Sequence, residues 1–303
     1  MSGTALLYAL IFLMVVFWSG NYIAGKIALR EFSPLLLAGL RIGLAGVAMV
    51  PLYFWERAKL GAGMSAGAAR TSACATGHLL LLGLLGVTLN QVFFIVGLSR
   101  TSVAHAAILI GLTPIQVLVI AGLRGQERIT ARKAAGMAIA LAGVAVLKWF
   151  EPAIGTGVGA GTTWTGDFVV FLGGLCFALF TVFGKEATAR YSTITMNTYA
   201  YVGGAVALLP LTLWEASRQP LAHVSAGAWL AAVYMALFPS VIAYLIYYHA
   251  LAHMTASRVS AFSYLQPVFA SIMGVVILSE RLGTPVIAGG LVILTGVYLA
   301  ERG

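Results

Sequence analysis

The sequence predicts an all-α integral membrane protein, in which ten transmembrane helices form two inverted five-helix repeats around a central cavity. Composition, the length of the apolar segments and self-similarity between the halves carry this prediction. Hydrophobic residues make up 60% of the 303 residues and charged residues 9%, whereas a soluble domain has about 45–50% and about 25%. So few charges cannot cover a soluble globule, and disorder needs low hydrophobicity. A lipid-facing surface needs no charge, so we expect the chain to lie in a membrane.

Ten segments are long and apolar enough to cross a bilayer, which takes about 20 residues. They are about 4–25, 34–54, 78–98, 102–123, 131–149, 166–185, 195–214, 227–249, 256–278 and 284–300. Membrane-spanning strands need only about 10 residues of alternating polarity, so these segments predict helices. The first apolar run, from Ala5 to about Ala24, has no Lys or Arg before it. We therefore expect a membrane helix there rather than a cleaved signal peptide.

The distribution of Lys and Arg predicts the orientation of the bundle. The even-numbered loops and the C-terminus hold eleven of these residues, and the odd-numbered loops hold six. Because cytoplasmic loops are enriched in Lys and Arg, both termini are expected in the cytoplasm, with the protein in the inner membrane. Topology therefore explains the net charge of +9. We expect membrane lipid as a partner and no nucleic acid, because no basic run has interleaved aromatics.

The two halves of the chain resemble each other. An ungapped shift of 153 residues aligns 101–147 with 254–300, and a shift of 159 aligns 25–56 with 184–215. The predicted organisation is a first repeat at 1–150, a linker at 151–165 and a second repeat at 166–303. Each repeat has five spans, so the second enters the membrane inverted. Such repeats are typical of secondary transporters, whose substrate site lies at the repeat interface near the midplane.

Two stretches carry a resemblance to a known family. They are FWSGNYIAGKIALREFSPLLLAGLRIGLAG at 17–46 and YYHALAHMTASRVSAFSYLQPVFASIMGVVILSERLGTPVIAGGLVILTGVYL at 247–299. In both features and spacing the chain resembles the EamA-domain family of the drug/metabolite transporter superfamily, nearest to bacterial exporters of amino acids, aromatic ones especially. The resemblance implies export of a small organic metabolite by alternating access. The alternatives are an importer or exchanger of another solute, such as a nucleotide-sugar or a small cation, and a non-transporting membrane receptor.

The nine acidic residues all lie in loops or at the ends of spans. Small multidrug members of the superfamily carry a glutamate in the first helix, and the first span here has none, which disfavours proton-coupled export of organic cations. The same distribution disfavours catalysis by paired carboxylates or metal-assisted hydrolysis. Cys74 and Cys176 lack the spacing of metal ligands. We expect no enzyme activity, no metal and no cofactor.

Candidate substrate-binding residues are amides and aromatics that share helix faces within the apolar spans. Amides in lipid are costly unless they face protein or water, and a cavity lined by amides and aromatics suits a small amphipathic solute. For each amide, hydrogen bonding between helices is the alternative. The candidates are Trp18, Asn21, Asn90, Gln91, Phe94, His105, Leu112, Gln116, Tyr244, Tyr247, Phe262 and Gln266.

The repeat-related residues Pro114 and Pro267 are predicted near the middle of their spans, as hinges or as static kinks. Glu127–Arg128 and the related Glu280–Arg281 are either gating ion pairs or solvated helix ends.

Two basic residues and several glycines within or at the ends of the spans also carry expectations. Arg41 lies inside the second span, where it pairs with either a backbone carbonyl or the substrate. Lys185 either extends to the membrane interface or binds a carboxylate. We expect close helix contacts at glycines spaced four or seven residues apart: Gly39, Gly43, Gly136, Gly143, Gly289 and Gly296.

Overall fold

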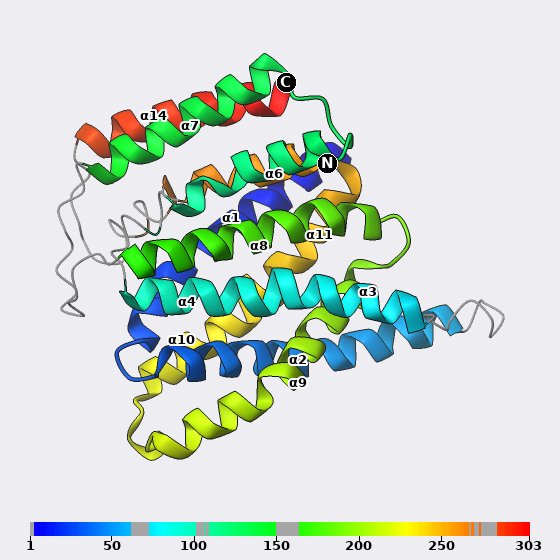
Figure 1. Cartoon of the computed structure of the whole chain (residues 1–303), viewed down its shortest axis with the longest axis vertical. Coiled ribbons are helices and arrows are strands. Elements are labelled where there is room, and N and C mark those ends of the chain that lie inside the picture. The colour runs from blue at the N-terminus through cyan, green and yellow to red at the C-terminus, as the bar shows by residue number, and fades with distance from the viewer. Residues whose placement is uncertain are drawn as a thin grey trace.

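The computed structural model describes residues 3–61, 73–100, 106, 109–149, 164–266, 268–269, 273 and 284–303. Within this part of the chain every regular element is a helix, and the helices form a bundle (Figure 1). The linker at 151–165 lies almost wholly outside the described residues, as do His105, Pro267 and Glu280–Arg281.

The first half of the chain contributes seven labelled elements. They are α1 (Gly3–Ala28), α2 (Pro34–Gly61), α3 (Ala73–Gly83), the π-helical turn η1 (Leu84–Leu89), α4 (Asn90–Arg100), α6 (Thr113–Leu123) and α7 (Ala131–Trp149).

The second half contributes nine. They are α8 (Trp164–Ala187), α9 (Thr193–Arg218), the 3₁₀ turn η2 (Leu221–His223), α10 (Ala226–Ala236), the π-helical turn η3 (Leu237–Ile242), α11 (Ala243–His253), α12 (Ala256–Ala261), the 3₁₀ turn η4 (Phe262–Leu265) and α14 (Thr284–Arg302).

Six helices in the described residues are long and apolar enough to cross a membrane. They run over Thr4–Ala28, Pro34–Lys59, Thr76–Arg100, Trp164–Ala187, Thr193–Arg218 and Ala226–His253. The prediction of membrane helices is thus confirmed for six of the ten segments. The other four segments contain α6, α7, α12 with η4, and α14, of which Leu109–Leu123 and Ala288–Ala300 are shorter apolar helices.

Helix bounds repeat at the same spacing as the sequence. The segment α3–η1–α4 (73–100) has the same pattern of helix bounds as the segment α10–η3–α11 (226–253). Each start, each end and each π-helical turn lies 153 residues further along the chain in the second segment, so the two π-helical turns occupy equivalent positions. The bounds of α7 and α14 are also 153 residues apart. Such π turns are rare and often lie at functional sites.

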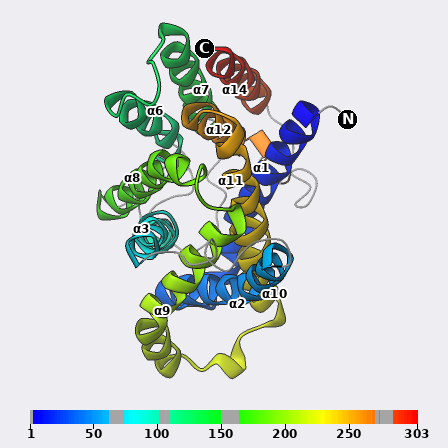
Figure 2. The same cartoon turned by 90° about the vertical axis from the view of Figure 1, so that its right-hand side faces the viewer.

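Packing pairs each helix of one half with a helix of the other. The most extensive contacts join α7 to α14, α2 to α9, and α4 to α8, and α1 packs along α10 and α11 (Figures 1 and 2). In the repeat, α1 corresponds to α8 and α4 corresponds to α11. Exchanging the two halves therefore turns the pair α4–α8 into the pair α11–α1. The first residues of α1 and the last residues of α14 lie towards the same side of the bundle (Figure 1).

Glycines allow the closest of these contacts. A Cβ at Gly136 would lie 2.4 Å from the Ala300 nitrogen, and one at Gly296 would lie 2.3 Å from the Ala140 nitrogen, so α7 and α14 meet backbone to backbone as predicted. The expectation was wrong at Gly43, where a Cβ would meet nothing within 4 Å. Spacing along a helix shows that two glycines are near each other, but not which direction they face.

An aromatic cluster fills the centre of the bundle. Its members, which we call the aromatic core, are Trp18, Phe177, Phe180, Tyr201, Tyr244, Tyr247 and Tyr248. The Trp18 ring lies 5.4 Å from the Tyr247 ring and 6.0 Å from the Tyr244 ring between centroids, in the tilted and edge-to-face arrangements that aromatic pairs prefer.

Candidate functional site

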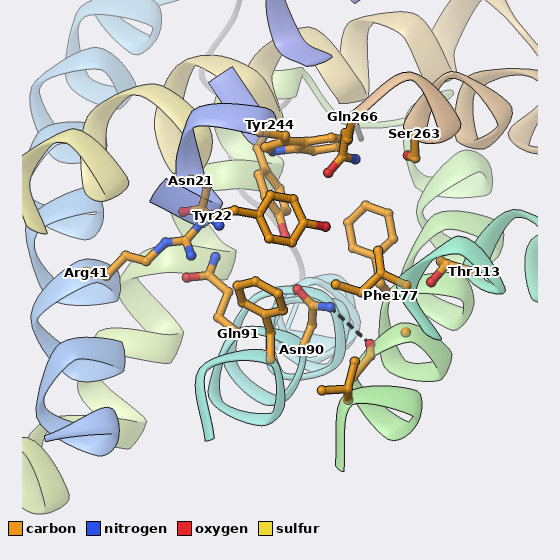
Figure 3. Close-up of a pocket in the computed structure, with 16 residues that line it drawn as sticks. Asn21, Tyr22, Arg41, Asn90, Gln91, Thr113, Phe177, Tyr244, Ser263 and Gln266 are labelled. Atoms are coloured by element: carbon orange, nitrogen blue, oxygen red, sulfur yellow. Dashed lines mark hydrogen bonds between the residues drawn. The ribbon is translucent and has the colours of Figure 1, made fainter. Parts of the chain in front are cut away.

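A cavity of about 100 Å³ lies between the two halves of the chain, beside the aromatic core (Figure 3). Residues of α1, α2, α4, α6, α8 and α11 line it, together with Ile110 just before α6 and residues in and just after η4. The lining residues are Trp18, Asn21, Tyr22, Arg41, Asn90, Gln91, Phe94, Ile110, Thr113, Val170, Gly173, Gly174, Phe177, Tyr244, Ser263 and Gln266. An engineered apolar cavity of about 150 Å³ binds benzene, so a space of this order admits part or all of a small organic molecule.

Seven of the twelve predicted residues line this one cavity. They are Trp18, Asn21, Asn90, Gln91, Phe94, Tyr244 and Gln266. They come from four separate segments of the chain, so the fold brings together side chains that the sequence related only by helix faces.

Four other candidates lie outside the lining. Leu112 precedes the first residue of α6, and Gln116 lies one turn further along, where its buried amide atoms have no hydrogen-bond partner. Tyr247 is fully buried, and its hydroxyl lies 2.6 Å from the Thr181 hydroxyl. Phe262 packs against Tyr8 and Phe12 on α1. The remaining candidate, His105, lies outside the described residues.

Several lining residues were not among the candidates. Arg41 carried a visible signal, because a charged residue inside an apolar span is a functional candidate by default. Gly173 and Gly174 carried a weaker one, as adjacent glycines within a span. No sequence signal marked the others, which are Tyr22, Ile110, Thr113, Val170, Phe177 and Ser263.

The polar groups of the cavity are only partly paired. Arg41 Nε donates a hydrogen bond of 2.8 Å to Ser240 Oγ on η3. Gln91 Nε2 donates to the Tyr201 hydroxyl at 3.1 Å. Asn90 Nδ2 donates to the Gly173 carbonyl at 3.0 Å, the bond that is dashed in Figure 3. The amide oxygens of Asn21 and Gln91 are buried and have no partner in the structure. Unsatisfied acceptors of this kind cost free energy unless a ligand or water pairs with them.

Two cavity aromatics bind carbonyls of the π-helical turns. Trp18 Nε1 donates to the Pro239 carbonyl in η3 at 3.0 Å, and the Tyr244 hydroxyl donates to the Gly86 carbonyl in η1 at 3.1 Å. Gly86 and Pro239 are 153 residues apart and hence equivalent in the repeat. Each π turn therefore has one carbonyl whose hydrogen bond comes from the wall of the cavity.

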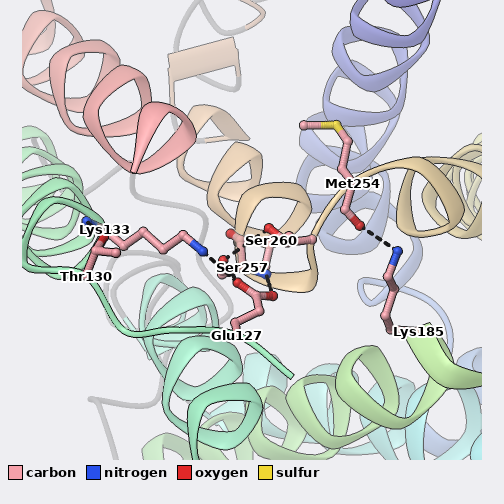
Figure 4. Close-up of polar contacts among 8 residues, drawn as sticks. Glu127, Thr130, Lys133, Lys185, Met254, Ser257 and Ser260 are labelled. Atoms are coloured by element: carbon pink, nitrogen blue, oxygen red, sulfur yellow. Dashed lines mark hydrogen bonds and ion pairs between the residues drawn. The ribbon is translucent and has the colours of Figure 1, made fainter. Parts of the chain in front are cut away.

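Polar contacts also join the helix ends near the α6–α7 loop (Figure 4). The Glu127 carboxylate accepts hydrogen bonds from the Ser257 backbone N–H at 3.0 Å, from the Ser257 hydroxyl, and from Lys133 Nζ at 2.9 Å. Burial raises the pKa of Glu127, but these hydrogen bonds outweigh it and hold the pKa below its ordinary value. Glu127 thus pairs with α7 and α12 and leaves Arg128 exposed, which differs from a Glu127–Arg128 pair.

The neighbouring turn between α11 and α12 is held by Lys185. Its Nζ donates to the Met254 carbonyl at 2.9 Å and to the Leu251 carbonyl (Figure 4). The ammonium group therefore binds backbone carbonyls at the end of α11 and takes no part in the cavity.

The sequence matches the model of the EamA-like transporter family twice, over residues 5–149 and 164–301. A protein of Archaeoglobus fulgidus named "Uncharacterized transporter" is 30% identical over 305 residues, which cover 98% of this chain and 97% of that protein. A "Probable terminal-alkyne amino-acid exporter" of Streptantibioticus cattleyicolor is 28% identical over 290 residues, covering 96% of this chain and 91% of that protein.

A solved structure described as "Crystal structure of protein" shares the fold, with a TM-score of 0.76 and 19% identity, and covers 98% of this chain and 97% of that one. Together with the apolar helices, the family match and the names of the relatives identify a multi-pass membrane transporter rather than an enzyme. The chain belongs to the EamA-like transporter family.

Proposed function

We propose that this protein is a secondary transporter that exports small organic metabolites, amino acids including aromatic ones, across the inner membrane by alternating access. The observation that carries the proposal is the cavity between the two halves, whose walls combine amide groups with aromatic rings. The partners in this proposal are a small solute and the surrounding lipid. The named amino-acid exporter among the relatives supports the substrate class.

The proposed architecture is ten spans in two inverted repeats, 1–150 and 166–303, with both termini in the cytoplasm. The equivalent bounds of α3–η1–α4 and α10–η3–α11 support the repeat, as does the double match of the family model. Pairing of each helix with one of the other half is the arrangement that a pseudo-two-fold axis produces.

The position of the cavity supports alternating access. Most of its residues lie in the second half of α1, the first half of α2, the second half of the α3–η1–α4 segment and around the first half of α8, which are the halves nearest the odd-numbered, outward-assigned loops. Tyr244, Ser263 and Gln266 line it from the halves nearest the even-numbered loops. Towards the even-numbered loops, the aromatic core and the Glu127–Ser257–Lys133 contacts close the bundle. We assign this arrangement to the conformation closed on the cytoplasmic side.

Pro114 and Pro267 act as hinges in this proposal. Pro114 is the second residue of α6, directly after a break in the helix at Leu112, and its missing N–H therefore removes no hydrogen bond from α6. The 3₁₀ turn η4 (Phe262–Leu265) precedes Pro267 at the equivalent position of the second repeat. A tight turn within a span often marks a hinge.

Transport by the purified full chain in liposomes tests the proposal. A panel of radiolabelled amino acids, nucleotide-sugars and organic cations is offered in counterflow, and amino acids are expected to exchange above the rate of empty liposomes. Gly174→Val should abolish this exchange, because a Cβ at Gly174 already lies 2.8 Å from the Thr113 hydroxyl and a larger side chain enters the cavity.

The matched control is Gly43→Val, at a position where a Cβ meets nothing within 4 Å. It should transport like the unmodified protein. Exchange of nucleotide-sugars or cations without exchange of any amino acid would refute the proposed substrate class. Equal exchange by Gly174→Val and the unmodified protein would refute the proposed site.

A further inference from the structure

We propose that Arg41 binds the carboxylate of the transported solute, while the amide oxygens of Asn21 and Gln91 accept hydrogen bonds from its ammonium group. The site would thus select zwitterionic α-amino acids over amines and amides. This inference rests on the proposed transport of amino acids and adds the residues and charges that would recognise them.

Arg41 is a buried cation, and none of the described residues that line the cavity is an anion. The residue is 3% exposed, and among the described residues that line the cavity it alone carries a charge. A buried charge is retained only when it is paired or hydrogen-bonded, since removing it from water is unfavourable. An anionic ligand group would supply the missing pair.

The contacts of Arg41 leave the terminal nitrogens of its guanidinium available to a ligand. Ser240 takes the Nε hydrogen bond and is itself anchored to the Met235 carbonyl at 2.8 Å. This contact fixes the guanidinium from one side. Figure 3 shows its terminal nitrogens pointing towards Asn21 and Gln91, inside the cavity. A guanidinium presents parallel N–H donors that match the two oxygens of a carboxylate.

Unpaired acceptors lie on the same wall. Asn21 is 8% exposed and Gln91 is 2% exposed, and the oxygen of each amide has no hydrogen-bond partner. The hydrogen bond from Gln91 Nε2 to the Tyr201 hydroxyl orients the Gln91 amide, and its oxygen remains available as an acceptor. An ammonium group has three donors and no acceptor, and these oxygens are the complement it needs.

The rest of the cavity suits an apolar side chain. Phe177 and Val170 of α8 and Ile110 before α6 line the cavity, together with Gly173 and Gly174, which have no side chain to fill it. Figure 3 shows Phe177 on the side of the cavity away from Arg41. A carboxylate, an ammonium and an apolar group are thus each matched by a different part of one cavity. An amine without the carboxylate would leave Arg41 unpaired, which is the basis of the expected selectivity.

The test compares three matched solutes in liposomes that contain the full chain. They are L-phenylalanine, L-phenylalaninamide, which lacks the carboxylate, and 3-phenylpropionate, which lacks the ammonium group; L-leucine, L-leucinamide and 4-methylpentanoate form a second set. Binding of each is also measured by the shift in thermal unfolding. We expect kcat/KM for the amino acid to exceed that for the amide at least tenfold. Arg41→Gln should remove this preference, and Arg41→Lys should retain part of it.

Arg218→Gln is the matched control, because Arg218 ends α9, stacks on the Trp214 ring and does not line the cavity. It should keep the preference unchanged. The comparison of solutes on the unmodified protein needs no variant, so a poorly folded Arg41→Gln would not prevent the test.

The outcomes separate this inference from the proposed function. Equal transport of amino acid and amide by the unmodified protein would overturn the inference while leaving the transporter intact. Retention of the full preference by Arg41→Gln would also overturn it. If no amino acid moves but 3-phenylpropionate or 4-methylpentanoate binds in an Arg41-dependent way, amino-acid export fails and the carboxylate site stands. Binding of none of the carboxylates would refute the site.

Discussion

At the scale of single residues, direction decides what a side chain does in this bundle. Gly43 and Gly136 are both glycines in apolar helices, yet a Cβ would enter open space at the first and reach the Ala300 backbone at 2.4 Å at the second. Glu127 and Glu186 are both acids near helix ends. The first is 5% exposed at its side chain and the second 48%.

Gly136→Ala should destabilise the protein by about 1–3 kcal/mol, the usual cost of forcing extra volume into a well-packed contact. The added methyl group would push α7 away from α14. Thermal unfolding in detergent measures the effect. Gly43→Ala should unfold at or slightly above the temperature of the unmodified protein, because alanine favours the helix and its Cβ meets nothing there. Equal melting temperatures for both variants would show that α7 and α14 do not meet closely.

Glu127→Gln should lower stability by about 1–3 kcal/mol at neutral pH, because an amide nitrogen cannot accept the hydrogen bonds from Ser257 and Lys133. The pKa of Glu127 is lowered in the folded state, so its contribution is fully present above its ordinary value of about 4.5 and is lost as the pH falls through the lowered value. The difference in melting temperature between Glu127→Gln and the unmodified protein should be constant near neutral pH and shrink in acid.

The exposed Glu186, which pairs with Arg124 at 2.8 Å, offers the matched control. Glu186→Gln should change stability little, because exposed ion pairs contribute about 0–1 kcal/mol. A pH-independent difference for Glu127→Gln would mean that its carboxylate does not hold these helix ends.

At the scale of elements, the two π-helical turns are the most unusual feature, and each depends on an aromatic from another helix. Trp18 of α1 binds the η3 carbonyl of Pro239, and Tyr244 of α11 binds the η1 carbonyl of Gly86. Because both aromatics also line the cavity, the geometry of the two spans is linked to the wall that a solute would touch.

Trp18→Phe and Tyr244→Phe should each destabilise the protein by about 1–3 kcal/mol, since each leaves one buried carbonyl without its donor. Thermal unfolding compares them with Trp214→Phe and Tyr298→Phe, whose side chains are 47% and 55% exposed. Melting temperatures as high as those of the two controls would show that the carbonyls find other partners.

Pro114→Ala should lower the turnover rate of transport more than the apparent affinity, because the alanine N–H allows α6 to continue through the break at Leu112. Counterflow at several solute concentrations separates the two effects. An unchanged turnover would indicate a static kink instead of a hinge.

At the scale of the whole molecule, helix pairs such as α7–α14 and α2–α9 join the two halves of the chain. Orientation can be tested directly in cells. In a background with Cys74→Ser and Cys176→Ser, Ala222→Cys in η2 and Arg128→Cys in the α6–α7 loop introduce one thiol each at exposed positions. A membrane-impermeant maleimide should label Ala222→Cys in intact cells and Arg128→Cys only after permeabilisation. The reverse pattern would invert the proposed topology.

Much of the fold could be predicted because length and apolarity are properties of the chain itself. A helix must satisfy its own backbone groups in lipid, so each long apolar run becomes helical. The shift of 153 residues likewise appeared first in paired residues such as Pro114 and Pro267 and recurs in the helix bounds. The lining of the cavity was predicted only in part, since Gln116 and Asn90 are both amides on apolar helices and only Asn90 reaches it.

The sequence by itself determined the helical membrane class, the internal similarity and the absence of acids from the middle of the spans, because composition and spacing record these directly. Only the tertiary structure decided that Arg41, Asn21 and Gln91 share one cavity, that Glu127 meets Ser257, and that Trp18 and Tyr244 hold the two π-helical turns. The physical reason is that lipid and protein core are equally apolar, so hydrophobicity does not reveal which face of a membrane helix points inward.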